Sequence, residues 1–266
     1  MIEIALLNVK FHSEILGMPV EMAVLLPQSF TENRQTFPTL YLLHEMGEGH
    51  TSWLRKTSSE RYIDDLSLAV VMPAGHTSYY TDMYYGKSYF TFITEELPLI
   101  CENMFPLSHS KNERFIAGNG IGGYGALKAG LSTSHTFSLA ASFSSPIDII
   151  GIVNRLDKQK AVDIFGRVDE ISTSTDNLYV AAETLLNANN PLPEFYLSCN
   201  AENALLEENE SFNTYLSNLG VKTTFEKTID EQTDWKHWDH SLETFISWLT
   251  LAKPGLTKRR NEHGVN

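Results

Sequence analysis

The chain of 266 residues has a formal net charge of −13, with 33 Asp and Glu against 20 Lys and Arg, and 42% of its residues are hydrophobic. A chain of this length and apolar content can bury one large core, so we expect a single domain. The acidic balance disfavours contact with phosphate backbones and with anionic lipid surfaces. We therefore expect neither a nucleic-acid partner nor a membrane partner.

The chain carries few signals of targeting or of disulfide chemistry. The residues Met1–Lys10 lack the basic start and the continuous apolar run of a secretory signal. No apolar stretch approaches the roughly 20 residues that span a bilayer. The two cysteines, Cys101 and Cys199, allow one disulfide but make no disulfide framework. These features predict a cytoplasmic protein, in which Cys199 is a packed thiol.

Short apolar runs of strand length alternate with helix-like stretches along the chain. Several runs are continuously apolar, which is typical of strands covered on both faces. The alternation predicts an α/β fold with a mostly parallel central sheet and helices on both faces. The early segments 2–11 and 20–26 are expected to add antiparallel strands at one edge. The predicted strands span 20–26, 40–43, 68–72, 115–117, 139–143, 195–199 and 223–226; the predicted helices span 59–65, 90–104, 122–131, 210–219 and 238–251.

Residues 145–190 interrupt this alternation. They contain helix-like pieces at 148–155 and 176–186 and no clear strand, which predicts a short cap-like insertion over one end of the sheet. We expect one domain over residues 1–252, followed by a solvated tail over 253–266 that includes Lys258-Arg259-Arg260.

The most informative segment is the glycine-rich turn of residues 118–125. An apolar strand leads into it and a helix follows, as in a phosphate-binding turn or in the nucleophile elbow G-x-S-x-G. A dinucleotide turn usually follows the first strand of its domain and is followed by an acidic residue about 20 positions on. This turn comes after several strands and lacks that residue, so the elbow is favoured. Gly118 and Gly122 then flank Gly120, which has no side chain that could attack a substrate.

From about residue 2 to residue 251, the chain resembles the esterase D group of α/β hydrolases, which includes the S-formylglutathione hydrolases, and in particular its bacterial tributyrin-esterase branch. The resemblance implies an α/β-hydrolase fold and carboxylic ester hydrolysis by a Ser-His-Asp triad. It rests on several motifs together: Leu42-Leu43-His44-Glu45-Met46, Ser52-Trp53-Leu54, Val70-Val71-Met72-Pro73, Tyr80-Thr81-Asp82, Tyr85-Gly86, Glu95-Glu96-Leu97-Pro98, Phe115-Ile116-Ala117-Gly118 and Gly122-Gly123-Tyr124-Gly125.

The chain departs from this family at each catalytic position. The resemblance places the serine at Gly120, the aspartate at Asn203 and the histidine at Thr233. The family's His-Gly pair reads His44-Glu45 here. In a triad the histidine takes the serine proton and the aspartate orients the histidine, so without the serine the other two have no task. Loss of all three positions indicates a natural pseudoenzyme.

Other residues are weaker candidates for a site. His237 and His240 have metal-ligand spacing, but a wet polar helix face is the favoured interpretation, and we expect neither a metal nor a cofactor. Ser144 and Ser145 follow a strand without lying on an elbow. His44 either lines the pocket or is a hydrogen-bonded structural histidine.

The resemblance also identifies the backbone N–H groups of Met46 and Ile121 with the family's oxyanion donors. These groups could still hold a small ester, carboxylate or sugar-like ligand. The charged side chain of Glu45 would, however, either occupy that position itself or repel an anionic ligand from it. A second hypothesis is an interaction protein, as a homo-oligomer or as the partner of an active paralogue. The alternative is a carboxylesterase that acts on short-chain or sugar esters through relocated residues. Because fold does not fix function, we favour the first two.

Overall fold

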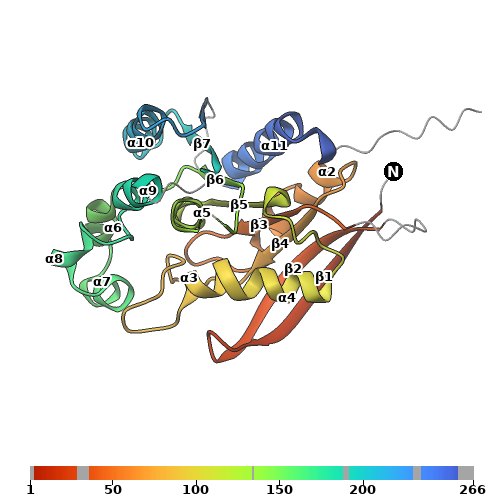
Figure 1. Cartoon of the computed structure of the whole chain (residues 1–266), viewed down its shortest axis with the longest axis horizontal. Helices are drawn as coiled ribbons and strands as arrows, with labels where there is room; N and C mark the ends of the chain where they lie inside the picture. Colours follow the sequence, from red (N-terminus) through yellow and green to blue (C-terminus); the bar gives the residue numbers. More distant parts are fainter. Residues whose placement is uncertain (1–2, 29–35, 134, 188–191, 230–234, 257–266) are drawn as a thin grey trace, which may run out of the picture.

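An eight-stranded sheet with strand order β1-β2-β4-β3-β5-β6-β7-β8 forms the centre of the computed structural model, which describes residues 3–28, 36–133, 135–187, 192–229 and 235–256 (Figure 1). β2 runs antiparallel to both β1 and β4, whereas the remaining pairs are parallel, as the sequence predicted. The strands are β1 (Glu3–Ser13), β2 (Met18–Gln28), β3 (Thr39–Leu43), β4 (Ala69–Pro73), β5 (Arg114–Asn119), β6 (Leu139–Phe143), β7 (Glu194–Asn200) and β8 (Thr223–Thr228).

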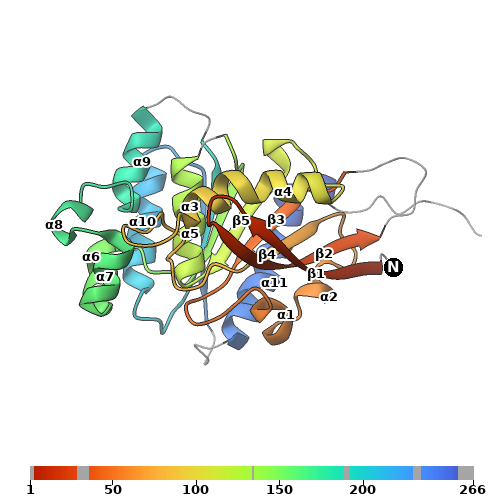
Figure 2. The ribbon, with the colours of Figure 1, turned by 90° about the horizontal axis from the view of Figure 1, so that it is seen from below.

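Helices cover both faces of the sheet because the central strands are apolar on both faces. In β5, Ile116 packs into the core under α4 (Leu97–Met104), α5 (Ile121–Ser132) and α10 (Leu206–Asn218). Its neighbours Phe115 and Ala117 point to the opposite face, into the core under α1 (Ser52–Lys56), α2 (Ser59–Ile63) and α11 (Trp235–Ala252). Figure 2 shows α4 and α5 on one side of the sheet, and α1, α2 and α11 on the other. The alternation of side chains along a strand thus builds two cores.

The predicted helix over 90–104 is instead three consecutive segments. α3 (Tyr89–Thr91) leads into the π-helical turn η1 (Phe92–Glu96), and α4 follows. Glu96, at the end of the π-helical turn, accepts hydrogen bonds from the Ser13 hydroxyl and from the N–H groups of Glu14 at 2.7 Å and Ile15 at 3.3 Å. This one carboxylate ties the β1–β2 hairpin turn to the helix.

Four helices fill the segment between β6 and β7 and lie together at one end of the molecule (Figure 1). They are α6 (Ile149–Arg155), α7 (Lys158–Phe165), α8 (Val168–Ile171) and α9 (Leu178–Asn187). Asp148 and Asp157 cap α6 and α7 by accepting backbone N–H groups at each first turn. The sequence predicted α6 and α9 but not α7 and α8, whose short amphipathic patterns are weak signals.

The prediction of a solvated tail from residue 253 is wrong at its start. Pro254–Leu256 forms a 3₁₀ turn, Leu256 is buried, and its carbonyl accepts the Ser67 N–H at 2.8 Å. The apolar Leu256 side chain completes the core beneath α11. Residues 257–266, with the basic run, lie outside the described residues. Among the described helices, none combines the length and apolarity needed to cross a bilayer.

Candidate functional site

Gly120 forms the turn between β5 and α5. Its φ of +50° and ψ of −120° place it in a conformation that side chains strongly disfavour. The two flanking glycines allow close backbone approach. A Cβ on Gly118 would lie 2.4 Å from the Gly122 carbonyl carbon, and a Cβ on Gly122 would lie 2.6 Å from the Leu43 carbonyl oxygen. The glycine spacing that favoured an elbow in the sequence therefore corresponds to a sharp strand–turn–helix with glycine at its centre.

The carboxylate of Glu45 lies directly over Gly120. A Cβ built on Gly120 would stand 1.1 Å from Glu45 Oε2 and 2.2 Å from its Cδ. Glu45 follows β3, the strand next to β5, so the sheet itself delivers this side chain to the turn. The space into which a nucleophile side chain would project from residue 120 is thus filled by a neighbouring carboxylate.

The same carboxylate takes both oxyanion donors that the sequence indicated. Met46 N–H donates to Glu45 Oε1 at 2.5 Å, and Ile121 N–H donates to Glu45 Oε2 at 3.3 Å. Ile121 is the first residue of α5, where exposed N–H groups and the helix dipole favour a negative charge. Of the two outcomes foreseen for its charge, Glu45 fills the site and satisfies the donors.

The environment of Glu45 raises its pKa to about 7. Burial is the largest cause, because it penalises the charged carboxylate; the two N–H donors oppose it, and the nearby Glu48 charge adds to the rise. Near neutral pH, Glu45 is therefore present both as carboxylate and as neutral acid. Perturbed pKa values are concentrated at functional sites.

His44 is a structural histidine. It is buried, and Nε2 accepts the Gly75 N–H at 2.9 Å, which leaves Nδ1 to donate to the Glu45 carbonyl at 2.8 Å. Its backbone N–H donates to the Tyr80 hydroxyl at 3.0 Å. Burial lowers the His44 pKa, so the ring is neutral. His44 holds the loop that presents Glu45 and does not offer a free nitrogen to a ligand.

Of the positions that the resemblance matched to the aspartate and the histidine, the structure describes only Asn203. The side-chain oxygen of Asn203 accepts the Leu205 N–H at 2.9 Å and so supports the turn before α10. Thr233 lies outside the described residues. The uncharged Asn203 amide therefore has a local structural role in this turn.

The interpretation of His237 as part of a wet helix face is wrong. His237 is buried, and its Nε2 lies 3.0 Å from the Ser144 hydroxyl. Thr228 Oγ1 lies 3.5 Å from Nδ1. Ser144 has a φ of +48°, rare for a residue other than glycine, and it directly follows β6 beside Gly120, whose N–H donates to the Phe143 carbonyl at 3.2 Å. Packing of α11 onto the sheet turns this histidine inward.

The remaining candidates, His240, Ser145 and the two cysteines, take no part in the contact between Ser144 and His237. His240 is half-exposed, 4.0 Å from Glu243, and the part of the chain that the structure describes holds no cluster of three or more metal-ligating side chains. The Ser145 hydroxyl donates to the Phe143 carbonyl at 3.4 Å. Cys101 and Cys199 are both buried and reduced, so Cys199 is a packed thiol as expected.

A family model described as "Putative esterase" matches residues 13–245. The chain belongs to this esterase family. The acetyl esterase of Caldicellulosiruptor saccharolyticus is 24% identical over 92% of this chain and 98% of its own length. The esterase Rv1288 of Mycobacterium tuberculosis is 28% identical over 80% of this chain, which spans about half of that protein, 52%.

Two solved structures from Staphylococcus aureus are similar along almost the whole chain. The fluorophosphonate-binding serine hydrolase FphF superposes with a TM-score of 0.87 at 28% identity, over 92% of this chain and 98% of that one. The S-formylglutathione hydrolase FrmB superposes with a TM-score of 0.84 at 28% identity, over 93% and 99%. These likenesses, together with the strand order, confirm the α/β-hydrolase fold and the resemblance to the esterase group.

Sequence reasoning about this esterase-family chain missed one feature of the site. It named Ser144 and His237 separately, but their pairing joins the end of β6 to the start of α11 across 93 residues, which no local pattern reveals. A signal was present in the positions themselves, because Ser144 directly follows a central parallel strand, at the sheet edge where α/β proteins bind ligands.

Proposed function

We propose that this chain is a catalytically inactive member of the esterase family that acts by binding a small ligand or a protein partner. One observation carries the proposal: the Glu45 carboxylate fills the nucleophile space over Gly120 and takes the N–H groups of Met46 and Ile121. Acyl transfer by a serine hydrolase needs a nucleophile at the elbow and free donors for the developing oxyanion. Neither requirement is met at this elbow.

Glu45 also indicates the chemical class of a ligand. An internal carboxylate already satisfies both N–H donors, so a short external carboxylate, or the carbonyl of an ester or acylated sugar, fits the same geometry once Glu45 moves away. Protonation of Glu45 near its raised pKa weakens its hold on the donors, because hydrogen bonds to a neutral acid are weaker than those to an anion. Ligand binding at this site is therefore a competition with the chain's own side chain.

The first test is hydrolysis of p-nitrophenyl acetate and butyrate, combined with a fluorophosphonate probe and mass spectrometry. We expect no turnover above a heat-treated sample and no adduct on the natural chain. The control is the variant Glu45→Gly, Gly120→Ser, Asn203→Asp, Thr233→His, which restores the family's residues and should form an adduct at position 120. Turnover by the natural chain, at a rate proportional to its concentration and absent from a mock purification, would refute inactivity.

The second test measures carboxylate binding by isothermal titration with acetate and butyrate. Glu45→Gly removes the internal competitor and should bind at least about tenfold more tightly than the natural chain, equivalent to 1.4 kcal/mol. Glu48→Gln changes a neighbouring charge without freeing the donors and should have a much smaller effect. If Glu45→Gly binds no carboxylate, the oxyanion donors are not a ligand site.

Protein interaction is the other form of binding that we propose, as a homo-oligomer or as a complex with an active paralogue. Support comes from the retention of the fold by a chain that has lost the family's triad residues. Sedimentation velocity over a range of concentrations tests self-association directly. A monomer at all concentrations that also fails to bind a co-expressed paralogue would argue against an interaction role.

A second candidate function is ester hydrolysis by relocated residues, and the Ser144–His237 pair favours it. The hydroxyl lies 3.0 Å from Nε2, within the hydrogen-bonding distance that a histidine-activated serine requires, and Ser144 has a φ of +48°. Both side chains are buried, at 4% and 1% exposure, which shields the hydroxyl from an ester. A fluorophosphonate adduct mapped to Ser144, and abolished by Ser144→Ala, would favour this candidate over inactivity.

A further inference from the structure

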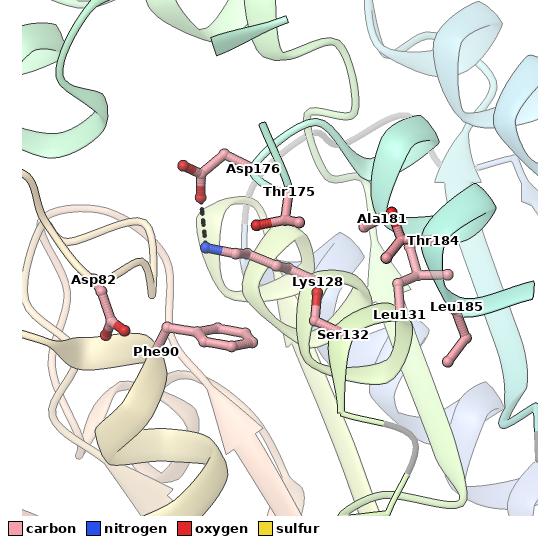
Figure 3. Close-up of a pocket in the computed structure, with 10 residues that line it drawn as sticks. All are labelled: Asp82, Phe90, Lys128, Leu131, Ser132, Thr175, Asp176, Ala181, Thr184 and Leu185. Carbon is pink, nitrogen blue, oxygen red and sulfur yellow. Dashed lines mark hydrogen bonds and ion pairs between the residues drawn. The ribbon is translucent and has the colours of Figure 1, made fainter. Parts of the chain in front are cut away.

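A cavity away from the elbow lies along the outer surface of α5. It has a volume of about 480 Å³, within the range of small-molecule sites. α5 contributes its floor, α9 one wall, and Phe90 with Asp82 the other wall, as Figure 3 shows. The lining residues are Asp82, Phe90, Lys128, Leu131, Ser132, Thr175, Asp176, Ala181, Thr184 and Leu185.

Lys128 is the distinctive residue of this cavity. It lies in the middle of α5, a helix whose other interior residues are apolar or glycine apart from Tyr124, and its side chain is only 6% exposed. Its ammonium donates to Asp176 Oδ1 at 2.5 Å and lies 4.5 Å from the centre of the Phe90 ring. An apolar side chain would serve packing equally well, because a buried ion pair gives little or no net stability. Tyr124 of the same helix also donates its hydroxyl to the Asp176 carbonyl at 2.6 Å, so Asp176 is fixed at the cavity together with the ammonium.

The polar groups at this end of the cavity can serve a ligand as both donors and acceptors. An ammonium has three N–H donors, and Asp176 accepts one of those of Lys128. Each carboxylate has about four acceptor positions; Asp82 uses part of its capacity on the N–H and hydroxyl of Thr91. The hydroxyl of Thr175 lines the same end.

Charge decides which class of ligand suits the cavity. The lining contains one cation, Lys128, and two anions, Asp82 and Asp176, so its formal charge is negative in a chain of net charge −13. This charge disfavours an anionic ligand. A lone cation would have to compete with the ammonium already placed between Asp176 and the Phe90 ring. A neutral ligand avoids both penalties.

We propose that this cavity binds a neutral polyhydroxylated ligand of monosaccharide size. Hydroxyl groups can both donate to the Asp82 and Asp176 carboxylates and accept from Lys128. A carboxylate could only accept from Lys128, and an alkyl chain could do neither. The Phe90 ring and the apolar side chains of Leu131 and Leu185 cover the C–H faces of such a ligand. The site is separate from the Glu45 elbow and does not depend on the function proposed for it.

Saturation-transfer NMR on the full chain tests the proposal, with D-xylose and methyl α-D-glucopyranoside as neutral probes and D-glucuronate as an anionic probe. We expect transfer to the neutral probes and at least tenfold weaker binding of glucuronate. Thr184→Phe places a ring in the cavity from an exposed position on α9 and should abolish transfer. Lys128→Met should weaken binding at least tenfold.

Matched controls separate this site from the elbow and from effects on folding. Thr214→Phe changes another exposed helical threonine with the same hydroxyl bond to the carbonyl four residues earlier, but outside the cavity, and should leave binding unchanged. Glu45→Gly should also leave it unchanged. Absence of transfer to both neutral probes, transfer that persists in Thr184→Phe, or preferential binding of glucuronate would overturn the proposal.

Discussion

At the scale of single residues, Gly120 and Glu45 fit together as a pair. The glycine leaves space over a turn with φ of +50°, and the glutamate fills that space while satisfying two N–H donors. A side chain on residue 120 and the Glu45 carboxylate in its present position therefore exclude each other. A serine placed at position 120 alone would overlap the carboxylate and displace it from its two N–H donors.

Substitution of Gly120 should be costly for two separable reasons. Gly120→Ala adds backbone strain and a collision with Glu45, whereas Gly47→Ala adds only strain, because Gly47 has a φ of +78° with nothing within 4 Å of its Cβ position. We expect Gly47→Ala to cost about 1–2 kcal/mol of unfolding free energy and Gly120→Ala about 1–3 kcal/mol more. Urea denaturation measures both.

A Glu45→Gly background should lower the cost of Gly120→Ala, because the collision partner is gone and only the backbone strain remains. Equal costs for Gly120→Ala in the two backgrounds would show that Glu45 does not occupy the space over residue 120.

The raised pKa of Glu45 predicts a pH dependence of stability. The pKa of Glu45 is about 7 in the native state against 4.5 as its ordinary value, so the native state binds the proton more tightly than the unfolded chain. The contribution of Glu45 protonation to the free energy of unfolding is full below pH 4.5 and is lost as the pH rises to about 7. At 1.36 kcal/mol per pKa unit, this contribution is on the order of 3 kcal/mol.

The measurement compares the natural chain with Glu45→Gln, which cannot titrate at this position. The unfolding free energy of the natural chain should fall relative to that of the variant between pH 4.5 and 7, and the difference should be constant above pH 8. A difference that rises with pH in that window would mean that the pKa of Glu45 is lowered rather than raised.

At the scale of elements, the β1–β2 hairpin depends on Glu96. This carboxylate accepts three hydrogen bonds from the hairpin turn, so Glu96→Gln should cost about 1.5–3 kcal/mol of unfolding free energy. Glu95→Gln removes an exposed charge from the same π-helical turn and should change stability by no more than about 0.5 kcal/mol. Similar effects of the two substitutions in thermal denaturation would mean that the hairpin is held by its β-ladder alone.

At the scale of the whole molecule, the net charge of −13 should make stability depend on salt. Added NaCl screens the repulsion among excess carboxylates, so the melting temperature at pH 7.5 should rise by a few degrees between about 10 and 300 mM NaCl. The effect should vanish near pH 5, close to the isoelectric point of about 5.1. A melting temperature that falls with salt at pH 7.5 would indicate that surface ion pairs outweigh the repulsion.

The sequence alone determined the architecture and the absence of a serine at the elbow. Continuously apolar strands such as Ala69–Pro73 are expected to be covered on both faces, and this local pattern predicted the layered sheet. The glycines around Gly120 set its register, because their spacing is local. Local patterns were weaker for the short helices α7 and α8, and they could not show that Leu256 is buried.

Tertiary structure alone decided what each polar group does. Glu45 and Ile121 are 76 residues apart, Ser144 and His237 are 93 apart, and Lys128 and Asp176 are 48 apart. The sequence left open whether the Glu45 side chain occupies the site of the two N–H donors or repels a ligand from it. It also placed His237 on a solvent-exposed helix face. Each outcome depends on which strand ends and helix faces meet when the two cores close on the sheet. A buried polar group must then find whatever partner that packing brings within hydrogen-bonding distance.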